Sequence, residues 1–292
     1  MDKPLSILYC NGLPRSGTTL LLSLLKAFPS IAIPGGYPYE LRVASYLASL
    51  NTILCKSSLS TNPWSFESSL LDTIAEPFPF CFDEDVNDWH IRCLAPAIRR
   101  ELANSLQALA CQLIESTALS EEPIWWVEKF PSLHEESIRD MFGNFNLITL
   151  IRDPIDITLS RISANINNIG SRQWIRDAEI RDNYVILKDQ ISGSLGLLEA
   201  EKEVSSRGGI CMLIKYDSLI TEPYLTLKRL GDKLGISLAE SSFNKALNKS
   251  RLHQPEHETE GSRKRSNLRE MLIAELTAED IRNLGTLGYT YA

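Results

Sequence analysis

A glycine-containing loop at residues 12–19 carries the clearest chemistry in this 292-residue chain. The loop follows an apolar run at residues 5–10 and precedes a leucine-rich segment, which is the order of a strand, a tight turn and a buried helix. Because backbone N–H groups at the start of such a helix bind anions, the loop is expected to hold a phosphate. Thr18 stands where a nucleoside triphosphatase loop has its lysine, so hydrolysis of ATP or GTP is disfavoured. Arg15 instead places a planar cation inside the loop.

A second polar block follows another apolar run, at residues 147–151. Asp153 and Pro154 are residue types that begin helices. Arg152 is therefore expected at the carboxyl end of a strand, and Ser160 about two turns into the helix that follows. A guanidinium and a hydroxyl in these places can bind a second phosphate. Two phosphate sites at one edge of a parallel sheet predict a nucleotide that is phosphorylated at both ends of its ribose.

Together, the two blocks resemble the sulfotransferase family, which uses 3′-phosphoadenosine-5′-phosphosulfate (PAPS). In that family the first loop holds the 5′-phosphosulfate, and an Arg and a Ser eight positions apart hold the 3′-phosphate. The resemblance continues at residues 126–131, 215–219 and 287–289, so it spans nearly the whole chain. It implies that PAPS is the co-substrate and that a sulfuryl group passes from it to an acceptor hydroxyl. The cofactor-binding residues that it implies are Arg15, Ser16, Gly17, Thr18 and Thr19 in the loop, with Arg152 and Ser160 for the 3′-phosphate.

The acceptor hydroxyl needs a base, because a neutral alcohol is a weak nucleophile. In the tyrosylprotein branch of the family the base is a Glu shortly after the first helix, followed by x-Arg. Glu40, in the run Glu40-Leu41-Arg42, has the corresponding place and is the base that we expect. Family members that act on small molecules use a His, and His90 is the alternative. The plainer interpretations are a carboxylate at a helix start for the Glu and an ordinary histidine for the His.

Lys129 ends an apolar run, where an ammonium is costly unless it meets an anion. An ion pair with Glu128 is the plainer explanation, but neighbouring residues of a strand point to opposite faces. The family resemblance places a Lys of this type at the bridging oxygen of the leaving phosphate. We therefore expect Lys129 to take part in catalysis, together with Arg15 in the loop.

Two later features are also expected near the nucleotide. The run 261–266 is the densest positive patch of the chain, and the resemblance implies a basic loop in which Arg263 and Lys264 close over the 3′-phosphate. A solvated run of charges explains the same pattern. Tyr216 is expected to pack on the nucleotide or to hydrogen-bond it, or else only to end a strand.

Alternating strand and helix signals predict an α/β fold. We expect an open, mainly parallel sheet flanked by helices, of the P-loop nucleotide-binding type. The length suits one domain over residues 1–292, with a largely helical insertion at about 34–120 that sets acceptor specificity. The expected strands are 5–11, 123–129, 147–152 and 209–215, and the expected helices are 17–28, 40–50 and 95–118.

The composition of the chain restricts the kinds of partner and cofactor that we expect. A net charge of −7 disfavours a diffuse nucleic-acid or anionic-membrane binder. The six cysteines form no Cys-x-x-Cys pair, so reduced thiols are favoured over disulfides or metal ligands, and no metal is expected. No apolar stretch reaches transmembrane length and the first strand leaves no room for a signal segment, which favours a cytoplasmic location.

Three functional classes fit these patterns. The first is a sulfotransferase whose acceptor is a hydroxyl-bearing small molecule, glycan, lipid or peptide. The second is a P-loop nucleoside triphosphatase or kinase, which the missing loop lysine disfavours. The third is a catalytically inactive nucleotide-binding protein of the same fold. The sequence carries no motif that identifies the acceptor or the oligomeric state.

Overall fold

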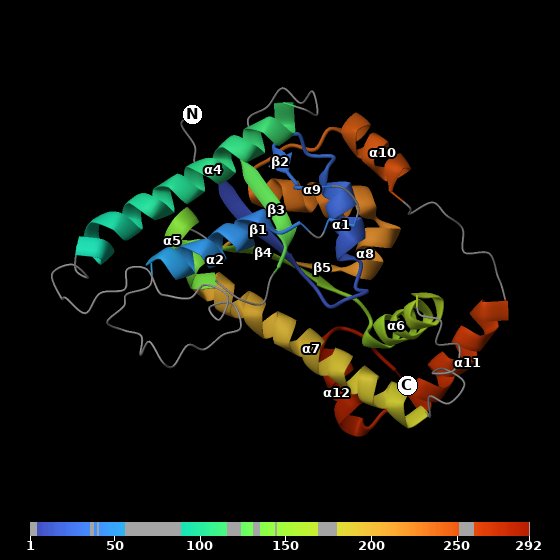
Figure 1. Ribbon diagram of the computed structural model, residues 1–292. Coiled ribbons are helices and arrows are strands. Elements are labelled where there is room, and N and C mark those ends of the chain that lie inside the picture. Colours follow the sequence, from blue (N-terminus) through green and yellow to red (C-terminus); the bar gives the residue numbers. More distant parts are fainter. Residues whose placement is uncertain are drawn as a thin grey trace. The chain divides into compact units, whose positions relative to one another are not determined.

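Figure 1 shows the helices and strands of the computed structural model. The chain forms two compact units. The first comprises residues 1–8 and 29–145, and the second comprises residues 9–28 and 146–292. One domain over residues 1–292 stays a prediction. The structure describes residues 5–35, 38–39, 41–55, 89–115, 124–130, 135–143, 145–168, 180–250 and 260–291.

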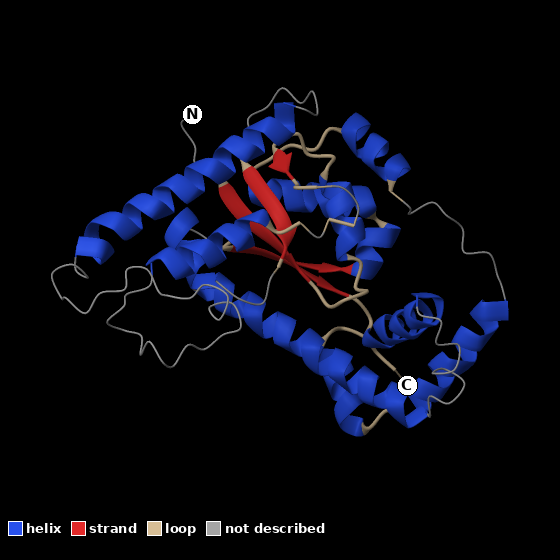
Figure 2. Cartoon of the chain, in the orientation of Figure 1, coloured by secondary structure: helices blue, strands red, loops and turns tan. Residues whose placement is uncertain are grey.

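Five strands form an open parallel sheet with the order β2-β3-β1-β4-β5, bounded by helices (Figure 2). This confirms the predicted α/β class. The four predicted strands are present with ends shifted by at most two residues, and β2 is an additional short strand. The strands are β1 (Ser6–Asn11), β2 (Ile31–Ala32), β3 (Trp125–Lys129), β4 (Asn146–Ile151) and β5 (Cys211–Lys215). Every residue of β4 is buried, as expected of a parallel strand that reads as a continuous apolar run.

Among the described residues of the first unit, the helices pack against one another. They are α2 (Val43–Cys55), the π-helix η1 (His90–Leu94), α4 (Ala95–Glu115) and α5 (Glu135–Phe142). Helix α2 contacts α4 and α5, and α4 also contacts β2. The described parts of region 34–120 are therefore mainly helical, as predicted, while its role in acceptor specificity stays a prediction.

The second unit holds the other helices of the described residues. They are α1 (Thr18–Leu25), α6 (Pro154–Asn168), α7 (Ile180–Ser206), α8 (Tyr216–Thr221), α9 (Pro223–Leu234), α10 (Glu240–Lys249), α11 (Glu260–Ala274) and α12 (Ala278–Thr286). Helix α7 packs on β4 and β5. A buried apolar cluster joins α6, α7, α11 and α12 through Ile155, Leu159, Leu187, Ile191, Leu272 and Leu284. The last two helices are thereby fixed on the helix that follows β4.

Two further properties concern the described residues alone. None of the helices in this part of the chain is long and apolar enough to cross a membrane. Four cysteines whose side chains the structure describes, Cys10, Cys93, Cys111 and Cys211, are free thiols, and the first and last of these are buried.

Candidate nucleotide-binding site

The loop between β1 and α1 adopts a conformation suited to anions. Arg15 has φ 74° and Gly17 has φ 102°, so two residues of this short loop are left-handed. The N–H of Ser16 donates to the carbonyl oxygen of Leu13 at 3.0 Å, which closes the turn. Gly17 is the N-cap of α1 and offers no side-chain cap, so the helix start keeps its backbone donors for another acceptor. Loops of this kind form concave nests of N–H groups.

The two polar blocks of the sequence meet beside this loop. Arg15 Nε donates to Ser160 Oγ at 3.2 Å, and Arg152 Nη1 donates to the carbonyl oxygen of Arg15 at 3.0 Å. Strands β1 and β4 are neighbours in the sheet, so the segments that follow them leave at the same edge. Residues more than 130 positions apart in sequence thereby form one polar cluster.

Tyr216 packs between the arginine and the loop. The guanidinium carbon of Arg152 lies 4.3 Å from the centre of the Tyr216 ring, which is a cation–π contact. Ile151, the last residue of β4, pairs with Lys215, the last residue of β5. Arg152 and Tyr216 directly follow these two residues, which explains why they are in contact. A Cβ atom at Gly17 would lie 2.6 Å from the same ring, so the ring fits only against a glycine.

Two buried polar atoms of this cluster have no hydrogen-bond partner among the described residues. They are Ser16 Oγ and Arg152 Nε. A buried polar group without a partner costs about 1–3 kcal/mol. Both atoms can donate a proton, so a ligand that carries phosphate oxygens would remove this cost. Two guanidinium groups and two hydroxyls within one cluster suit such a ligand.

Helix α6 begins as the sequence predicts. Pro154 is its first residue, and Asp153 Oδ1 accepts a hydrogen bond from the N–H of Ile155 at 2.9 Å. This side-chain cap fixes the turn from β4 into α6. Ser160 consequently lies about two turns into the helix, on the side that faces Arg15.

The end of β3 contributes two charged residues with different environments. Lys129 is the last residue of the strand and is half-buried. Glu128 is only 1% exposed, and its carboxylate accepts hydrogen bonds from Ala44 N at 3.0 Å, Ser45 N at 2.9 Å, Ser45 Oγ at 2.5 Å and Trp126 Nε1 at 2.9 Å. Burial raises the pKa of Glu128, and the donated hydrogen bonds oppose that rise. Glu128 thus caps the start of α2 from a distant strand.

Sequence reasoning missed this role of Glu128. A charged residue inside an otherwise apolar strand was the available signal. Apart from Trp126 in the same strand, the partners of that residue come from α2, more than 80 positions earlier, so no local pattern identifies them.

Four of the predicted site residues, Glu40, His90, Arg263 and Lys264, have side chains that the structure does not describe. Glu40 lies outside the described residues. His90 is the first residue of η1, and its side chain lies outside the described part. The backbone of Arg263 and Lys264 belongs to α11, so the run that we expected as a loop is helical, in keeping with the helix-forming residues around it.

A comparison with family models decides the classification. The model described as "Sulfotransferase family" matches residues 8–240, well over half of the chain. This chain belongs to the sulfotransferase family. The match includes the loop, β3, β4 and the start of α6, whereas α11, α12 and the residues after them lie beyond it.

Solved structures of other sulfotransferases resemble this sulfotransferase at low identity. The sulfotransferase domain of the Synechococcus PCC 7002 olefin synthase is 15% identical, with 100% of this chain and 98% of that chain covered and a TM-score of 0.46. The sulfotransferase domain from the curacin biosynthetic pathway is 16% identical, with both chains covered fully and a TM-score of 0.47. Mouse sulfotransferase SULT7A1, complexed with PAP, is 11% identical, with 98% and 83% covered and a TM-score of 0.41. No curated protein sequence matches the chain.

Proposed function

We propose that this sulfotransferase moves a sulfuryl group from PAPS to an acceptor hydroxyl by in-line transfer. The observation that carries the proposal is the cluster of Arg15, Arg152, Ser160 and Tyr216 beside an uncapped helix start. A loop for one phosphate and an arginine–serine pair for a second match a nucleotide that is phosphorylated at both its 3′ and 5′ positions. Adenosine-3′,5′-bisphosphate is the part of PAPS that this cluster suits.

The residues divide between the two phosphates. The loop residues Ser16, Gly17, Thr18 and Thr19 hold the 5′-phosphosulfate through backbone N–H groups and hydroxyls. Arg152 and Ser160 hold the 3′-phosphate. Ser160 Oγ accepts a hydrogen bond from Arg15, so its own proton is available for a phosphate oxygen. Tyr216, which already stacks on Arg152, packs against the nucleotide.

The transfer step needs a base and a means of neutralising the leaving group. A bond forms between the acceptor oxygen and sulfur while the bond from sulfur to the bridging phosphate oxygen breaks. The acceptor proton passes to Glu40, and the products are the sulfated acceptor and adenosine-3′,5′-bisphosphate. Lys129 and Arg15 stabilise the charge that develops on the leaving phosphate and on the sulfuryl oxygens. His90 is the alternative base.

The anchoring of α2 supports the assignment of Glu40. This residue precedes the first residue of α2, Val43, by three positions. The buried carboxylate of Glu128 binds the N–H groups of Ala44 and Ser45, so the start of that helix is fixed to β3. A fixed helix start that follows the proposed base closely in sequence suits a reaction that depends on the position of a proton acceptor.

The basic run is proposed to complete the 3′-phosphate site. Arg263 and Lys264 belong to α11, and α11 packs on α6, the helix that carries Ser160. Cations on a helix that is fixed in this way can neutralise the second charge of the 3′-phosphate. The acceptor is a hydroxyl-bearing molecule.

Calorimetry tests the proposal. The wild-type chain should bind adenosine-3′,5′-bisphosphate more tightly than AMP. Replacing Arg152 with alanine should weaken binding of the bisphosphate by roughly ten- to a hundredfold, the effect of about 1.5–3 kcal/mol from one charge-assisted contact. Arg229→Ala, at an exposed position of α9, is the matched control and should bind as the wild type does. Equal affinity of the wild type for both nucleotides would refute the proposal.

A further inference from the structure

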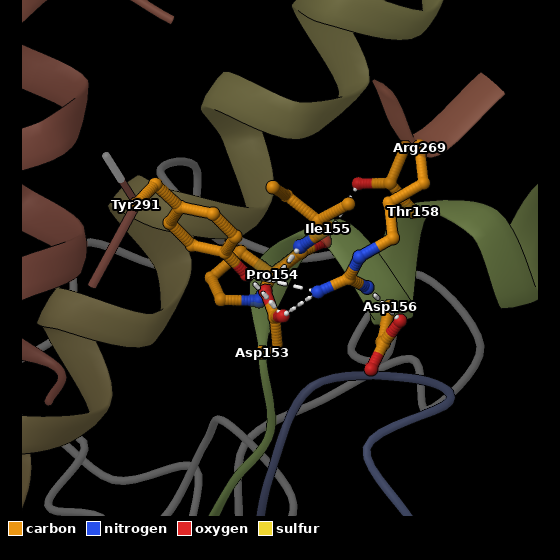
Figure 3. Close-up of polar contacts among 7 residues, drawn as sticks. All are labelled: Asp153, Pro154, Ile155, Asp156, Thr158, Arg269 and Tyr291. Atoms are coloured by element: carbon orange, nitrogen blue, oxygen red, sulfur yellow. Dashed lines mark hydrogen bonds and ion pairs between the residues drawn. The ribbon is translucent and has the colours of Figure 1, made fainter. Parts of the chain in front are cut away.

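Three side chains from distant parts of the chain meet at the start of α6 (Figure 3). Asp153 directly follows Arg152. Its Oδ2 accepts one hydrogen bond from Arg269 Nη2 at 3.0 Å and another from Tyr291 Oη, while its Oδ1 caps the helix at Ile155. Burial, and then the hydrogen bond to Asp153, raises the pKa of Tyr291, so the hydroxyl stays protonated and donates. Both carboxylate oxygens are engaged, which fixes the turn that follows Arg152.

Arg269 binds a second carboxylate of the same helix. Its Nη1 lies 2.5 Å from Asp156 Oδ1, and its Nη2 also donates to Tyr291 Oη at 3.3 Å. The side chain of Asp153 is 7% exposed and that of Arg269 is 34% exposed, so this pair is better shielded from water than an ordinary surface ion pair. A guanidinium that spans two carboxylates holds α11, with the basic run 261–266, in one position on α6.

The residues after α12 are held at a second point. Gly288 has φ 80° and follows the helix end, so the chain turns there. Its carbonyl oxygen accepts a hydrogen bond from Lys215 Nζ at 3.1 Å, and the same ammonium lies 5.3 Å from the centre of the Tyr289 ring. Lys215 is the residue directly before Tyr216. Segment 288–291 therefore binds residues adjacent in sequence to both members of the stacked pair.

We propose that Arg269 and Tyr291 are positioning residues for the 3′-phosphate, because through Asp153 they hold Arg152 in the orientation that binds it. The inference rests on the proposed function, in which Arg152 contacts this phosphate. Both positioning residues lie beyond residues 8–240, the part that matches the family model.

The experiment measures a selectivity ratio, the dissociation constant for AMP divided by that for adenosine-3′,5′-bisphosphate. Calorimetry on the full chain gives this ratio for the wild type, Tyr291→Phe, Arg269→Gln and Arg269→Lys. Tyr224→Phe, whose ring packs edge-on against Phe243, is the control for loss of a hydroxyl. Arg207→Gln, which breaks an exposed ion pair between Glu203 of α7 and the residue that follows this helix, is the control for loss of a guanidinium.

Tyr291→Phe and Arg269→Gln should each lower the ratio by about fivefold or more, mainly through weaker binding of the bisphosphate. The ratio of Arg269→Lys should lie between that of the wild type and that of Arg269→Gln, because an ammonium can bind one carboxylate but cannot span two. Both controls should keep the ratio within about twofold. Variants that melt at a lower temperature but keep the wild-type ratio would show that the cluster serves stability alone, which overturns the inference.

A double variant separates positioning from direct effects. In the Arg152→Ala background, Tyr291→Phe should leave the ratio unchanged, since the residue through which it acts has been removed. If Tyr291→Phe lowers the ratio in that background by as much as it does in the wild type, the inference is overturned. Should Arg269→Gln fail to fold, Tyr291→Phe, which removes a single oxygen atom, still decides the question. A wild type without preference for the bisphosphate would refute the proposed function, and only through it the inference.

Discussion

An alanine at position 17 is expected to remove tight nucleotide binding. Its Cβ would lie 2.6 Å from the Cδ2 and Cε2 atoms of Tyr216, about 1 Å closer than carbon atoms normally pack. The ring cannot move away without losing its contact with the Arg152 guanidinium, which lies 4.3 Å from its centre. The substitution therefore acts on the proposed 3′-phosphate residue through one intervening side chain.

The size of the effect follows from the contacts that are lost. The cation–π contact contributes about 0.5–2 kcal/mol. A displaced Arg152 also forfeits a charge-assisted contact with the phosphate, worth about 1.5–3 kcal/mol. The sum, about 2–5 kcal/mol, corresponds to at least roughly thirtyfold weaker binding of adenosine-3′,5′-bisphosphate. Backbone strain of about 1–2 kcal/mol from the left-handed conformation adds to the loss of stability.

Gly208→Ala is the matched control for this substitution. Gly208 has φ 81°, but a Cβ atom there would meet nothing within 4 Å. Gly208→Ala therefore introduces the same backbone strain but no steric clash. It should lower the melting temperature and leave the affinity for the bisphosphate unchanged. Calorimetry and thermal unfolding of both variants give the comparison. If Gly17→Ala binds the bisphosphate within about threefold of the wild type, the packing of Gly17 against Tyr216 does not control the site, and the reasoning is refuted.

Three other outcomes are expected. Glu128→Gln should lower the unfolding free energy by about 1–3 kcal/mol, because an amide cannot accept all four hydrogen bonds and leaves a buried N–H without an acceptor. Thermal unfolding measures this change, and it should find no such change for the control Glu199→Gln, at an exposed position of α7. Glu40→Gln should keep nucleotide affinity while transfer from PAPS at saturating nucleotide falls by about 10²–10⁴-fold, whereas His90→Asn should cost little, and the reverse pattern would identify His90 as the base. Transfer should persist in EDTA, because arginine, lysine and backbone N–H groups neutralise the phosphosulfate, and a strict need for magnesium would favour the triphosphatase class instead.

Local patterns predicted much of the fold. The apolar runs at 5–11 and 147–152 became β1 and β4, because a strand buried on both faces has a continuous apolar sequence. Asp153 and Pro154 marked the start of α6, since capping chemistry depends on a few consecutive residues. The two residues of β2 were too few to form a pattern. The run 261–266 was expected as a loop from a family resemblance, whereas the strong helix formers that follow it, in residues 268–274, favour the helix that includes it.

The sequence by itself determined which groups a phosphate site can use: a glycine-containing loop with Arg15, and an arginine and a serine eight positions apart. The tertiary structure alone decided how these groups are supported. Strand order and register bring Arg15 to Ser160 and Arg152 to Tyr216, and long-range folding brings Tyr291 to the residue after Arg152. A residue's own type and neighbours set its local conformation and its chemistry. Its partners depend on packing among segments more than sixty positions apart, which no local pattern encodes.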